Sequence, residues 1–351
     1  MRPIHQLLSS AARGDAVTQQ ALAWQELLAK WGREGEVLSE HVHPDLCGRV
    51  HRLDRAGLRL LERGDLILRY SVWSKTADLA LAARGRVALV YHNITPGHLL
   101  RAYNPALADL CDRGRSALVR FRGAFDAVIA DSSFNVCDLA EAGVEGATVV
   151  PLLLDLPPQA PRRDPVSACP VILAVGRIVP NKRVEDAIKA FTLFQRHRAP
   201  DAWLVLVGSP VGFERYRRDL VRLVSDLGAK RVFFAGAISS RARDVWYRRA
   251  DAFISMSVHE GFGAPPVEAL AHGVPVVARS AGAVPETLGG AGLLVDGDDL
   301  VLAAEGLHEL TSSRETRAAL AGAAERRLAE LRPEAVEPRI RDALQQLLDG
   351  S

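Results

Sequence analysis

The chain has 351 residues, which exceeds the roughly 100–200 residues of one typical domain, so two domains are expected. Its apolar fraction of 48% and charged fraction of 25% are typical of an ordinary soluble globular protein. The formal net charge of +2 gives no strong attraction for nucleic acid, and no segment approaches the ~20 apolar residues that span a bilayer.

The first half of the chain alternates short apolar segments with amphipathic ones, a pattern typical of βα units and a parallel sheet. The first strand is predicted at residues 3–8, and a turn of small residues that ends at Gly14 and Asp15 leads into a helix at 16–32. The further strands predicted in this half lie at 36–38, 66–70, 87–91, 127–130 and 148–150.

Six prolines and several charged residues between positions 151 and 170 predict an interdomain linker. We therefore divide the chain into a domain at 1–157, a linker at 158–170, a second domain at 171–330, and a C-terminal helix at 331–351 that can cross back to the first domain. The predicted strands of the second domain lie at 171–175, 203–207, 232–235, 252–258 and 275–278. The predicted helices lie at 184–198, 213–227 and 241–249, with a final helical segment from about 300 that is interrupted at Pro333.

The N-terminus has no long apolar core and no small-residue cleavage site, so we expect no signal peptide. The four cysteines show neither metal-ligand nor redox spacing and are expected to be buried free thiols in a reducing compartment. They are Cys47, Cys111, Cys137 and Cys169. These features predict a cytoplasmic protein whose contact with the inner face of the membrane is at most peripheral.

Two glutamates, Glu260 and Glu268, lie eight positions apart across a glycine-rich turn and a proline pair. The segment follows the strand predicted at 252–258, and open α/β sheets bind ligands where their strands end. The prolines suit the first positions of a helix, and Gly273 suits the position after its end. Because the turn's amides and the helix dipole favour an anion, the two carboxylates are placed to bind hydroxyls of a sugar and a ribose beside it.

A second turn, at residues 176–182, carries Arg177 and Lys182 between the first strand and the first helix of the second domain. Arginine offers a planar fork for phosphate oxygens and lysine a compact point charge, so both cations can converge on one anion. The alternative is two solvated loop cations, and the spacing alone does not decide between them.

The first domain offers weaker signals. Gly14 lets the backbone approach a ligand at the start of a helix, and His92 ends a predicted strand, where it can hydrogen-bond a substrate hydroxyl. A lone histidine is nevertheless more often structural. The chain has no G-x-G-x-x-G in the right context, no Walker lysine, no Asp-x-Asp after a strand, and no histidine spacing that favours zinc.

In combination, these motifs resemble the retaining, GT-B-fold glycosyltransferases usually called family 4. The segments of the second half that carry the resemblance are 176–182, 260–268, 273–278 and 281–286. The segments of the first half that resemble a bacterial branch of this family are 5–6, 14–16 and 91–96. The resemblance implies an α/β fold of two Rossmann-like doubly wound domains that face each other across an interdomain cleft.

The resemblance also implies roles for single residues. Arg177 and Lys182 would hold the donor's diphosphate and stabilise its charge as the glycosidic bond breaks, so neither a metal ion nor a cofactor is expected. Glu260 would bind hydroxyls of the transferred sugar and Glu268 those of the ribose. His92 would contact the sugar or orient the acceptor.

The rest of the implied donor site is mainly backbone. The amides at 261–263 would lie near the sugar and the β-phosphate, the backbone at 237–238 would meet the base, and the glycine at 14 would let the first domain close over the diphosphate. The residues of this part of the site are Gly14, Asp15, Gly176, Ala237, Ile238, Gly261, Phe262 and Gly263.

The implied reaction is a retaining, metal-independent transfer of a hexose from a UDP- or GDP-sugar to a hydroxyl of a glycan, a lipid-linked glycan or a small molecule. In the front-face account of the family, a diphosphate oxygen takes the acceptor's proton and neither glutamate is a nucleophile, unlike the paired carboxylates of retaining glycosidases. A GT-B sugar-nucleotide epimerase, a phosphorylase and a non-catalytic two-domain sugar-binding protein stay open as alternatives.

Overall fold

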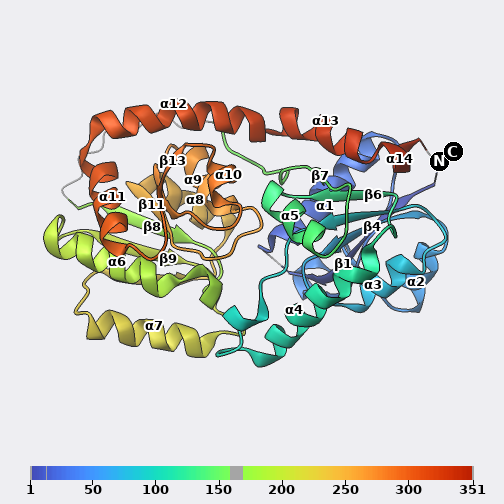
Figure 1. The fold of residues 1–351 in the computed structure, drawn as a ribbon, viewed down its shortest axis with the longest axis horizontal. Coiled ribbons are helices and arrows are strands. Elements are labelled where there is room, and N and C mark those ends of the chain that lie inside the picture. The colour runs from blue at the N-terminus through green and yellow to red at the C-terminus, as the bar shows by residue number, and fades with distance from the viewer. Residues whose placement is uncertain (1, 13, 159–168, 350–351) are drawn as a thin grey trace. The chain divides into compact units, whose positions relative to one another are not determined.

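The computed structural model describes residues 2–12, 14–158 and 169–349. It divides into two compact units (Figure 1). Unit 1 comprises residues 1–97, 106–154 and 331–351, and unit 2 comprises residues 98–105 and 155–330. Most of the predicted linker lies outside the described residues, and the C-terminal segment groups with unit 1.

Unit 1 contains one seven-stranded sheet in the order β3-β2-β1-β4-β5-β6-β7, in which all strand pairs are parallel. Its strands are β1 (Ile4–Ala11), β2 (Val37–Val42), β3 (His51–Arg52), β4 (Asp65–Tyr70), β5 (Val87–Tyr91), β6 (Ala127–Ala130) and β7 (Thr148–Val149). Its helices are α1 (Ala16–Lys30), α2 (Arg55–Leu61), α3 (Lys75–Leu81), α4 (Pro105–Ala117), α5 (Ser133–Glu141), α13 (Pro333–Ala343) and α14 (Gln345–Leu348).

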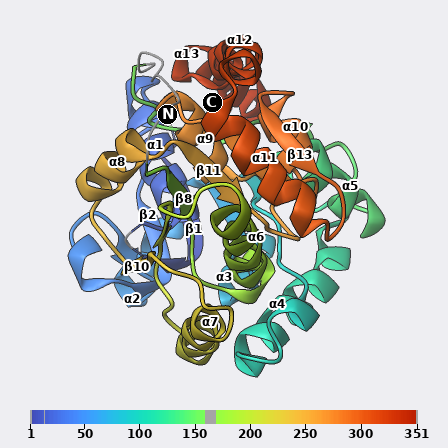
Figure 2. The ribbon, with the colours of Figure 1, turned by 90° about the vertical axis from the view of Figure 1, so that its left-hand side faces the viewer.

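Unit 2 contains a six-stranded parallel sheet in the order β10-β9-β8-β11-β12-β13. Its strands are β8 (Val171–Val175), β9 (Trp203–Val207), β10 (Val232–Gly236), β11 (Ala252–Ser255), β12 (Val276–Arg279) and β13 (Gly292–Val295). Its helices are α6 (Val184–His197), α7 (Glu214–Asp226), α8 (Ser240–Arg249), α9 (Ala264–Ala271), α10 (Val284–Leu288), α11 (Leu300–Ser312) and α12 (Arg314–Leu331). Helices α6 and α11 pack side by side against this sheet (Figure 2).

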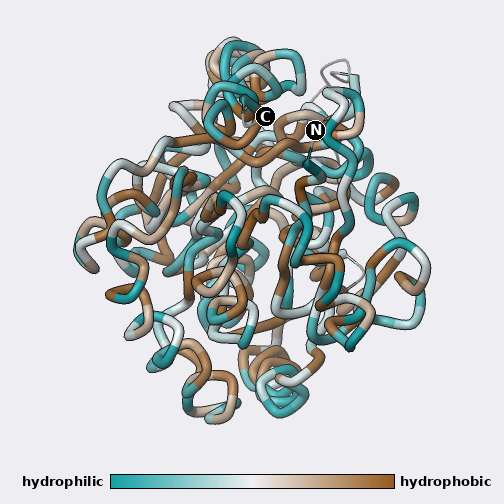
Figure 3. The backbone as a smooth tube through the Cα atoms, turned by 90° about the vertical axis from the view of Figure 1, so that its right-hand side faces the viewer, coloured by the Kyte–Doolittle hydropathy of each residue, from teal (hydrophilic) through white to brown (hydrophobic). Residues whose placement is uncertain are grey.

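These two sheets confirm the predicted fold class of two Rossmann-like doubly wound halves. The helices show the alternation of hydrophobic and hydrophilic residues that packing against a sheet requires (Figure 3). The predicted break at Pro333 is confirmed, since α12 ends at Leu331 and α13 begins at the proline.

The predicted end of one strand and the predicted burial of the cysteines were wrong. The strand predicted at 252–258 ends at Ser255, because the following backbone bonds to other groups: Met256 O accepts from Arg279 and Val258 N donates to Asn181 O. Only one of the four cysteines is buried, although all four are described and none forms a disulfide bond. Cys111 is the buried one, and Cys47, Cys137 and Cys169 are exposed.

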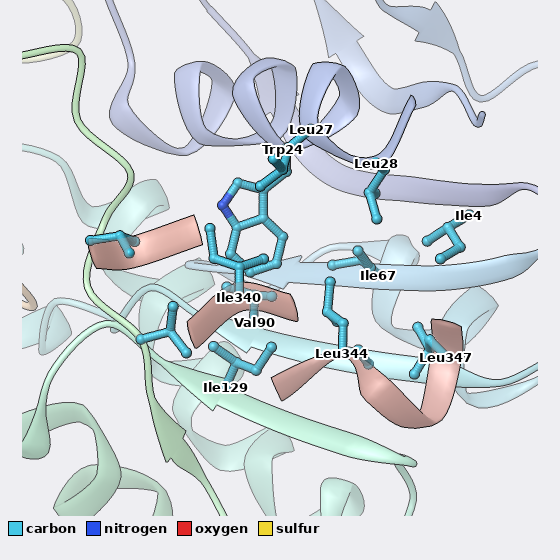
Figure 4. Close-up of a cluster of buried hydrophobic side chains, with 13 residues drawn as sticks. Ile4, Trp24, Leu27, Leu28, Ile67, Val90, Ile129, Ile340, Leu344 and Leu347 are labelled. Carbon is cyan, nitrogen blue, oxygen red and sulfur yellow. The ribbon is translucent and has the colours of Figure 1, made fainter. Parts of the chain in front are cut away.

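The core of unit 1 includes the C-terminal helices (Figure 4). Trp24 of α1 lies in one cluster with strand residues such as Ile67 and Val90 and with Ile340 of α13. Helix α1 begins where the Asp15 carboxylate accepts hydrogen bonds from Thr18 N and Oγ1, and its buried face then meets this cluster. Helices α13 and α14 therefore help to hold unit 1 together.

We predict that Ile340→Ala lowers the free energy of unfolding of unit 1 by about 2–5 kcal/mol, because the side chain is 0% exposed and its removal leaves a cavity. Denaturant unfolding of the full chain measures the change. The control, Val301→Ala at a position that is 63% exposed, should stay within about 0.5 kcal/mol of the parent protein. Equal effects of the two substitutions would contradict the assigned core.

Candidate functional site

Unit 2 has its topological switch point between β8 and β11. From β8 the chain runs outward through α6 to β9, and from β11 it runs to the other side through α9 to β12. In an open parallel sheet the crevice for a ligand opens at the carboxyl ends of two such strands. The predicted turn at 176–182 follows β8 and the predicted Glu260–Glu268 motif follows β11, so both lie at this position.

The turn after β8 starts with a close backbone crossing. Gly176 has a φ of +149°, and its carbonyl oxygen lies so near Gly208 that a Cβ there would come within 1.7 Å of it. Arg177 is exposed, with its guanidinium carbon 5.9 Å from the centre of the Phe213 ring. The turn closes with a short 3-10 helix, Pro180–Lys182, which directs the lysine toward the neighbouring turn.

Lys182 and Glu260 form an ion pair across the switch point. Lys182 Nζ lies 2.5 Å from Glu260 Oε1, and the two side chains are 24% and 11% exposed. A second link joins the same turns, because Asn181 accepts from Val258 N and donates to His259 O. The structure therefore brings together two residues that the sequence assigns separately, to the diphosphate and to the sugar.

The turn after β12 holds the backbone of Glu260 through a hydrogen bond. Ala283 N donates to Glu260 O at 2.9 Å, and a Cβ on Gly282, which has a φ of +57°, would lie 2.5 Å from that oxygen. This glycine lies in the segment 281–286 that carries the family resemblance, but its steric role was not predicted. A side chain at this position would displace the Glu260 backbone.

The glycine-rich turn leads into α9, as predicted, but the proline pair reduces the number of amide donors at the start of this helix. Gly263, with a φ of +92°, precedes the helix, and Phe262 is buried, with its carbonyl accepting from Thr287 Oγ1 at 2.6 Å. Helix α9 begins at Ala264, one residue before the predicted proline start, and Pro265 and Pro266 follow in its first turn. Because proline has no N–H, Pro265 and Pro266 remove two of the amide donors that an anion would use.

Glu268 has partners of its own, which are not those of the ion pair. Its Oε2 accepts a 2.8 Å hydrogen bond from the Tyr247 hydroxyl, and its Oε1 lies 3.4 Å from the Arg243 guanidinium. Burial raises the pKa of Glu268, and the guanidinium and the hydroxyl oppose that shift. The two glutamates of the motif thus occupy different environments.

The other predicted residues of unit 2 lie farther along the sheet. Ala237 is exposed and Ile238 is half-buried in the turn after β10, the edge strand.

Gly176, Arg177 and Lys182 line a hollow of about 30 Å³ at the end of β8. This hollow is far below the roughly 300–1,000 Å³ of a typical ligand pocket, so it accommodates part of a ligand at most.

Unit 1 has its own switch point, between β1 and β4. Gly14 follows β1 with a φ of +74°, and no heavy atom lies within 4 Å of the position that a Cβ would take, so its conformation, rather than crowding within the unit, requires glycine. Asp15 is occupied as the N-cap of α1. The predicted helix start at position 16 is confirmed, whereas β1 runs to Ala11 and includes the first residues of the predicted turn.

His92 follows β5 and is the centre of a buried polar network. Its Nδ1 lies 2.8 Å from Asp131 Oδ2 and its Nε2 lies 3.2 Å from the guanidinium of Arg69, and the ring is 4% exposed. Arg69 also donates to Gln6 Oε1 at 2.8 Å and lies 4.5 Å over the Trp24 ring. Both ring nitrogens are therefore occupied by partners inside unit 1.

This network determines the imidazole tautomer. A guanidinium has no lone pair to accept with, so Nε2 must accept from Arg69, and the ring proton is then on Nδ1, which donates to Asp131. Burial lowers the pKa of Arg69 to about 9, and the Asp131 carboxylate opposes that shift. The backbone N–H of His92 is also occupied, since it donates to Tyr70 O at 2.9 Å.

The partners of His92 were not predicted from the sequence. Arg69 lies within the apolar run of β4, and Asp131 directly follows that of β6. Both residues therefore lie at the carboxyl ends of the two strands that flank β5. A charged residue at the end of an apolar strand is the signal that was available. A second buried arginine, Arg279 of β12, shows the same pattern and binds Asp186 and the carbonyl oxygens of Met256 and Gly297.

A further hollow in unit 1, of about 650 Å³, lies away from these sites. Its lining includes Arg86, which precedes β5, and Ala127 and Thr148, the first residues of β6 and β7. Among the described residues, no group of three or more His, Cys, Asp or Glu side chains is arranged to hold a metal ion. No helix within the described ranges has the length and apolar composition to cross a membrane.

Comparison with known proteins identifies the second half of the chain. Residues 163–327 match the family model described as glycosyl transferases group 1. This segment belongs to that family. The match contains both turns at the switch point of unit 2, so the family predicted from the motifs is confirmed.

Curated relatives match over part of the chain. A GDP-mannose-dependent alpha-(1-6)-phosphatidylinositol monomannoside mannosyltransferase of Mycolicibacterium smegmatis is 37% identical over 142 residues, 37% of this chain and 36% of the relative. A D-inositol 3-phosphate glycosyltransferase of Rhodococcus opacus is 36% identical over 162 residues, 44% of this chain and 36% of the relative. The chain thus matches little more than a third of the length of these two relatives.

Solved structures match over the whole chain. A sucrose-phosphate synthase from Thermosynechococcus elongatus has a TM-score of 0.79 at 20% identity and covers 100% of both chains. The HepE protein of Anabaena, in complex with UDP and glucose, has a TM-score of 0.77 at 19% identity and covers 99% of this chain and 100% of that one. At these identities the likeness shows the fold, and it agrees with the predicted GT-B architecture.

We predict that 15N NMR of histidine-labelled protein at pH 7 shows His92 with a protonated Nδ1 and an unprotonated Nε2. Arg69→Met removes the donor to Nε2, so we expect that nitrogen to become partly protonated. The control is Arg120→Met, which removes a half-exposed cation of the same unit and should leave the His92 signals unchanged. A wild-type ring that is protonated at Nε2 would refute the assigned network.

Proposed function

We propose that the protein is a glycosyltransferase that moves a hexose from a nucleotide diphosphate sugar to a hydroxyl group. The observation that carries the proposal is the pairing of Lys182 with Glu260 at the switch point of a group 1 domain. An ammonium beside a carboxylate offers a partner for phosphate oxygens and a partner for sugar hydroxyls within one small region. The relatives described above are named as mannosyl- and glycosyltransferases, which supports this class.

We assign the donor's groups to the two turns. Arg177, exposed beside the hollow, and Lys182 hold the diphosphate, while Glu260 accepts hydrogen bonds from the sugar. Glu268 accepts from the ribose, and the backbone at 237–238 contacts the base. The donor is a UDP- or GDP-sugar: the Anabaena structure contains UDP and glucose, and the Mycolicibacterium relative is named for GDP-mannose.

The chemistry follows from the charges. As the bond from the anomeric carbon to the diphosphate breaks, negative charge develops on the leaving oxygen, and Arg177 and Lys182 stabilise it without a metal ion. A diphosphate oxygen accepts the proton of the attacking hydroxyl, which enters from the leaving group's side and retains the anomeric configuration. Glu260 is engaged with Lys182 and acts as a binding group rather than as a nucleophile.

The acceptor is a hydroxyl of a glycan, a lipid-linked glycan or a small molecule. The Mycolicibacterium relative is named for a phosphatidylinositol mannoside acceptor, which favours a lipid-linked glycan here. We place the reaction in the cytoplasm, with membrane contact that is at most peripheral. Incubation with a panel of UDP-, GDP- and ADP-sugars and glycan acceptors, read by mass spectrometry, identifies the pair. Conversion of the sugar nucleotide without any acceptor would instead indicate an epimerase.

We expect Arg177→Ala and Lys182→Ala each to lower kcat/KM by roughly 100- to 1,000-fold, the usual effect of removing one donor that stabilises developing negative charge. Steady-state kinetics with the donor found in the panel measures the effect. Arg222→Ala and Lys230→Ala replace exposed cations of the same unit and serve as matched controls with unchanged rates. Unchanged activity of both Arg177→Ala and Lys182→Ala would overturn the assigned roles.

Metal independence is tested separately. Because two side-chain cations offset the diphosphate charge, we expect EDTA to leave the transfer rate unchanged. A loss of transfer that added Mg²⁺ or Mn²⁺ restores would show that a metal ion takes part and would overturn this part of the proposal.

A further inference from the structure

Four side chains of α8 and α9 form a buried polar group in unit 2, which we call the α8–α9 cluster: Arg243, Tyr247, Glu268 and His272. Arg243 and Tyr247 are four positions apart on α8, and Glu268 of α9 lies four positions before His272, the C-cap of that helix. Residues four apart lie on one face of a helix, so the two helices present two facing pairs. Within this cluster Tyr247 is 0% exposed, whereas the Glu268 side chain is 18% exposed.

The aromatic rings of the cluster hold Tyr247 in place without using its hydroxyl. The ring stacks on His272 with centroids 4.8 Å apart and planes at 16°, and it stacks on Phe253 of β11 at 6.2 Å. His272 is itself fixed, because its Nδ1 lies 2.8 Å from the backbone oxygen of Glu268 and donates to it. The position of the Tyr247 hydroxyl is therefore set by packing.

This hydroxyl is directed at the Glu268 carboxylate. It lies 2.8 Å from Oε2 and 3.2 Å from the carbonyl oxygen of Pro265, so the carboxylate is the nearer acceptor. Arg243 approaches the other oxygen at 3.4 Å, and its Nε is buried without a hydrogen-bond partner among the described residues. An ionised carboxylate has about four lone-pair sites, so this arrangement leaves further sites for an incoming ligand.

Burial disfavours the ionised form of Glu268, which is the form with the most sites for accepting hydrogen bonds from a ligand. It raises the pKa of Glu268, and the hydroxyl of Tyr247 and the guanidinium of Arg243 act in the opposite direction. Removal of either partner therefore favours the protonated acid, which has lost part of its accepting capacity. The carboxylate also becomes free to rotate when the packed hydroxyl no longer holds Oε2.

We propose that Tyr247 and Arg243 are positioning residues for nucleotide recognition, which hold the Glu268 carboxylate ionised and in one orientation so that it accepts both hydroxyls of a ribose diol. The inference rests on the proposed function, which assigns Glu268 to the ribose. It adds that selection for a ribonucleotide depends on a tyrosine and an arginine of the preceding helix. Neither residue needs to touch the nucleotide.

The test compares binding of UDP and GDP with binding of their 2′-deoxy forms by isothermal titration calorimetry. Hydrogen bonds to a charged group predict that the wild-type protein prefers the ribonucleotide by about 10- to 100-fold. We expect Tyr247→Phe to bind the ribonucleotide about tenfold more weakly and the 2′-deoxy form almost as before, so the ratio falls toward one. Arg243→Gln should lower the ratio in the same direction, and Glu268→Gln should abolish it.

Tyr70→Phe is the matched control, because Tyr70 is a buried tyrosine of unit 1 whose hydroxyl donates a single 3.1 Å hydrogen bond to Gly114 O. It should leave the ratio unchanged, and thermal unfolding of every variant confirms that it is folded. Equal weakening of both nucleotide forms in Tyr247→Phe would assign the tyrosine a structural role alone and overturn the inference. A wild-type protein that binds nucleotides without preferring the ribose form would overturn the role of Glu268 while the transferase proposal stands. Absence of binding to UDP and GDP would overturn the donor assignment itself.

Discussion

The ion pair between Lys182 and Glu260 is the interaction on which the arrangement of unit 2 depends. It joins the turns after β8 and β11, the two strands whose connections diverge at the switch point. Neither charge is fully buried, so each keeps contact with solvent and both avoid the full desolvation cost of an ion pair in the interior. The pair therefore holds two turns together while its atoms stay accessible to a polar ligand.

Unit 1 arranges its charged groups differently, at the carboxyl ends of β4, β5 and β6. There the charged groups Arg69 and Asp131 are almost fully buried, and His92 bridges them. A buried guanidinium is tolerated because its donors are directed at Gln6, at the imidazole and at the face of Trp24. Such a network has one consistent set of proton positions, so it fixes the geometry of the loop after β5.

The order of strands and helices was predictable because each element of a parallel sheet has its own apolar signature. β5 and β8, for example, match their predicted bounds at both ends. The contacts of the charged residues were not predictable in this way. Tyr247 and Glu268 meet although 21 positions separate them, and Arg69 meets His92 across 23, so each contact depends on which strands become neighbours.

The strand predicted at 252–258 ended early for a related reason. An apolar run indicates which residues are buried, not which are paired in a sheet. Met256 and Ser257 are still buried, although the strand pairing stops at Ser255. Hydrogen bonds from the neighbouring turn and from Arg279 take over the backbone at that point. Those partners come from distant parts of the chain, so a local pattern contains no information about them.

The helix termini at the switch point explain why side-chain cations are needed for an anion. The first turn of α9 contains Pro265 and Pro266, which have no amide hydrogen to donate. Helix α6 carries Glu185 and Asp186 in its first turn, and the amide of Val184 already donates to the Tyr216 hydroxyl.

Both termini are thus less suited to bind a phosphate with their backbone. The start of α9 has two amide donors fewer than usual, and α6 carries two carboxylates at the positive end of its helix dipole. In the proposed donor site, the positive charge near the diphosphate therefore comes mainly from side chains. Of the predicted residues, Arg177 is exposed beside the hollow at the end of β8, and Lys182 is directed across the switch point. The proposed roles, cations for the diphosphate and carboxylates for the hydroxyls, thus agree with how the two helices begin.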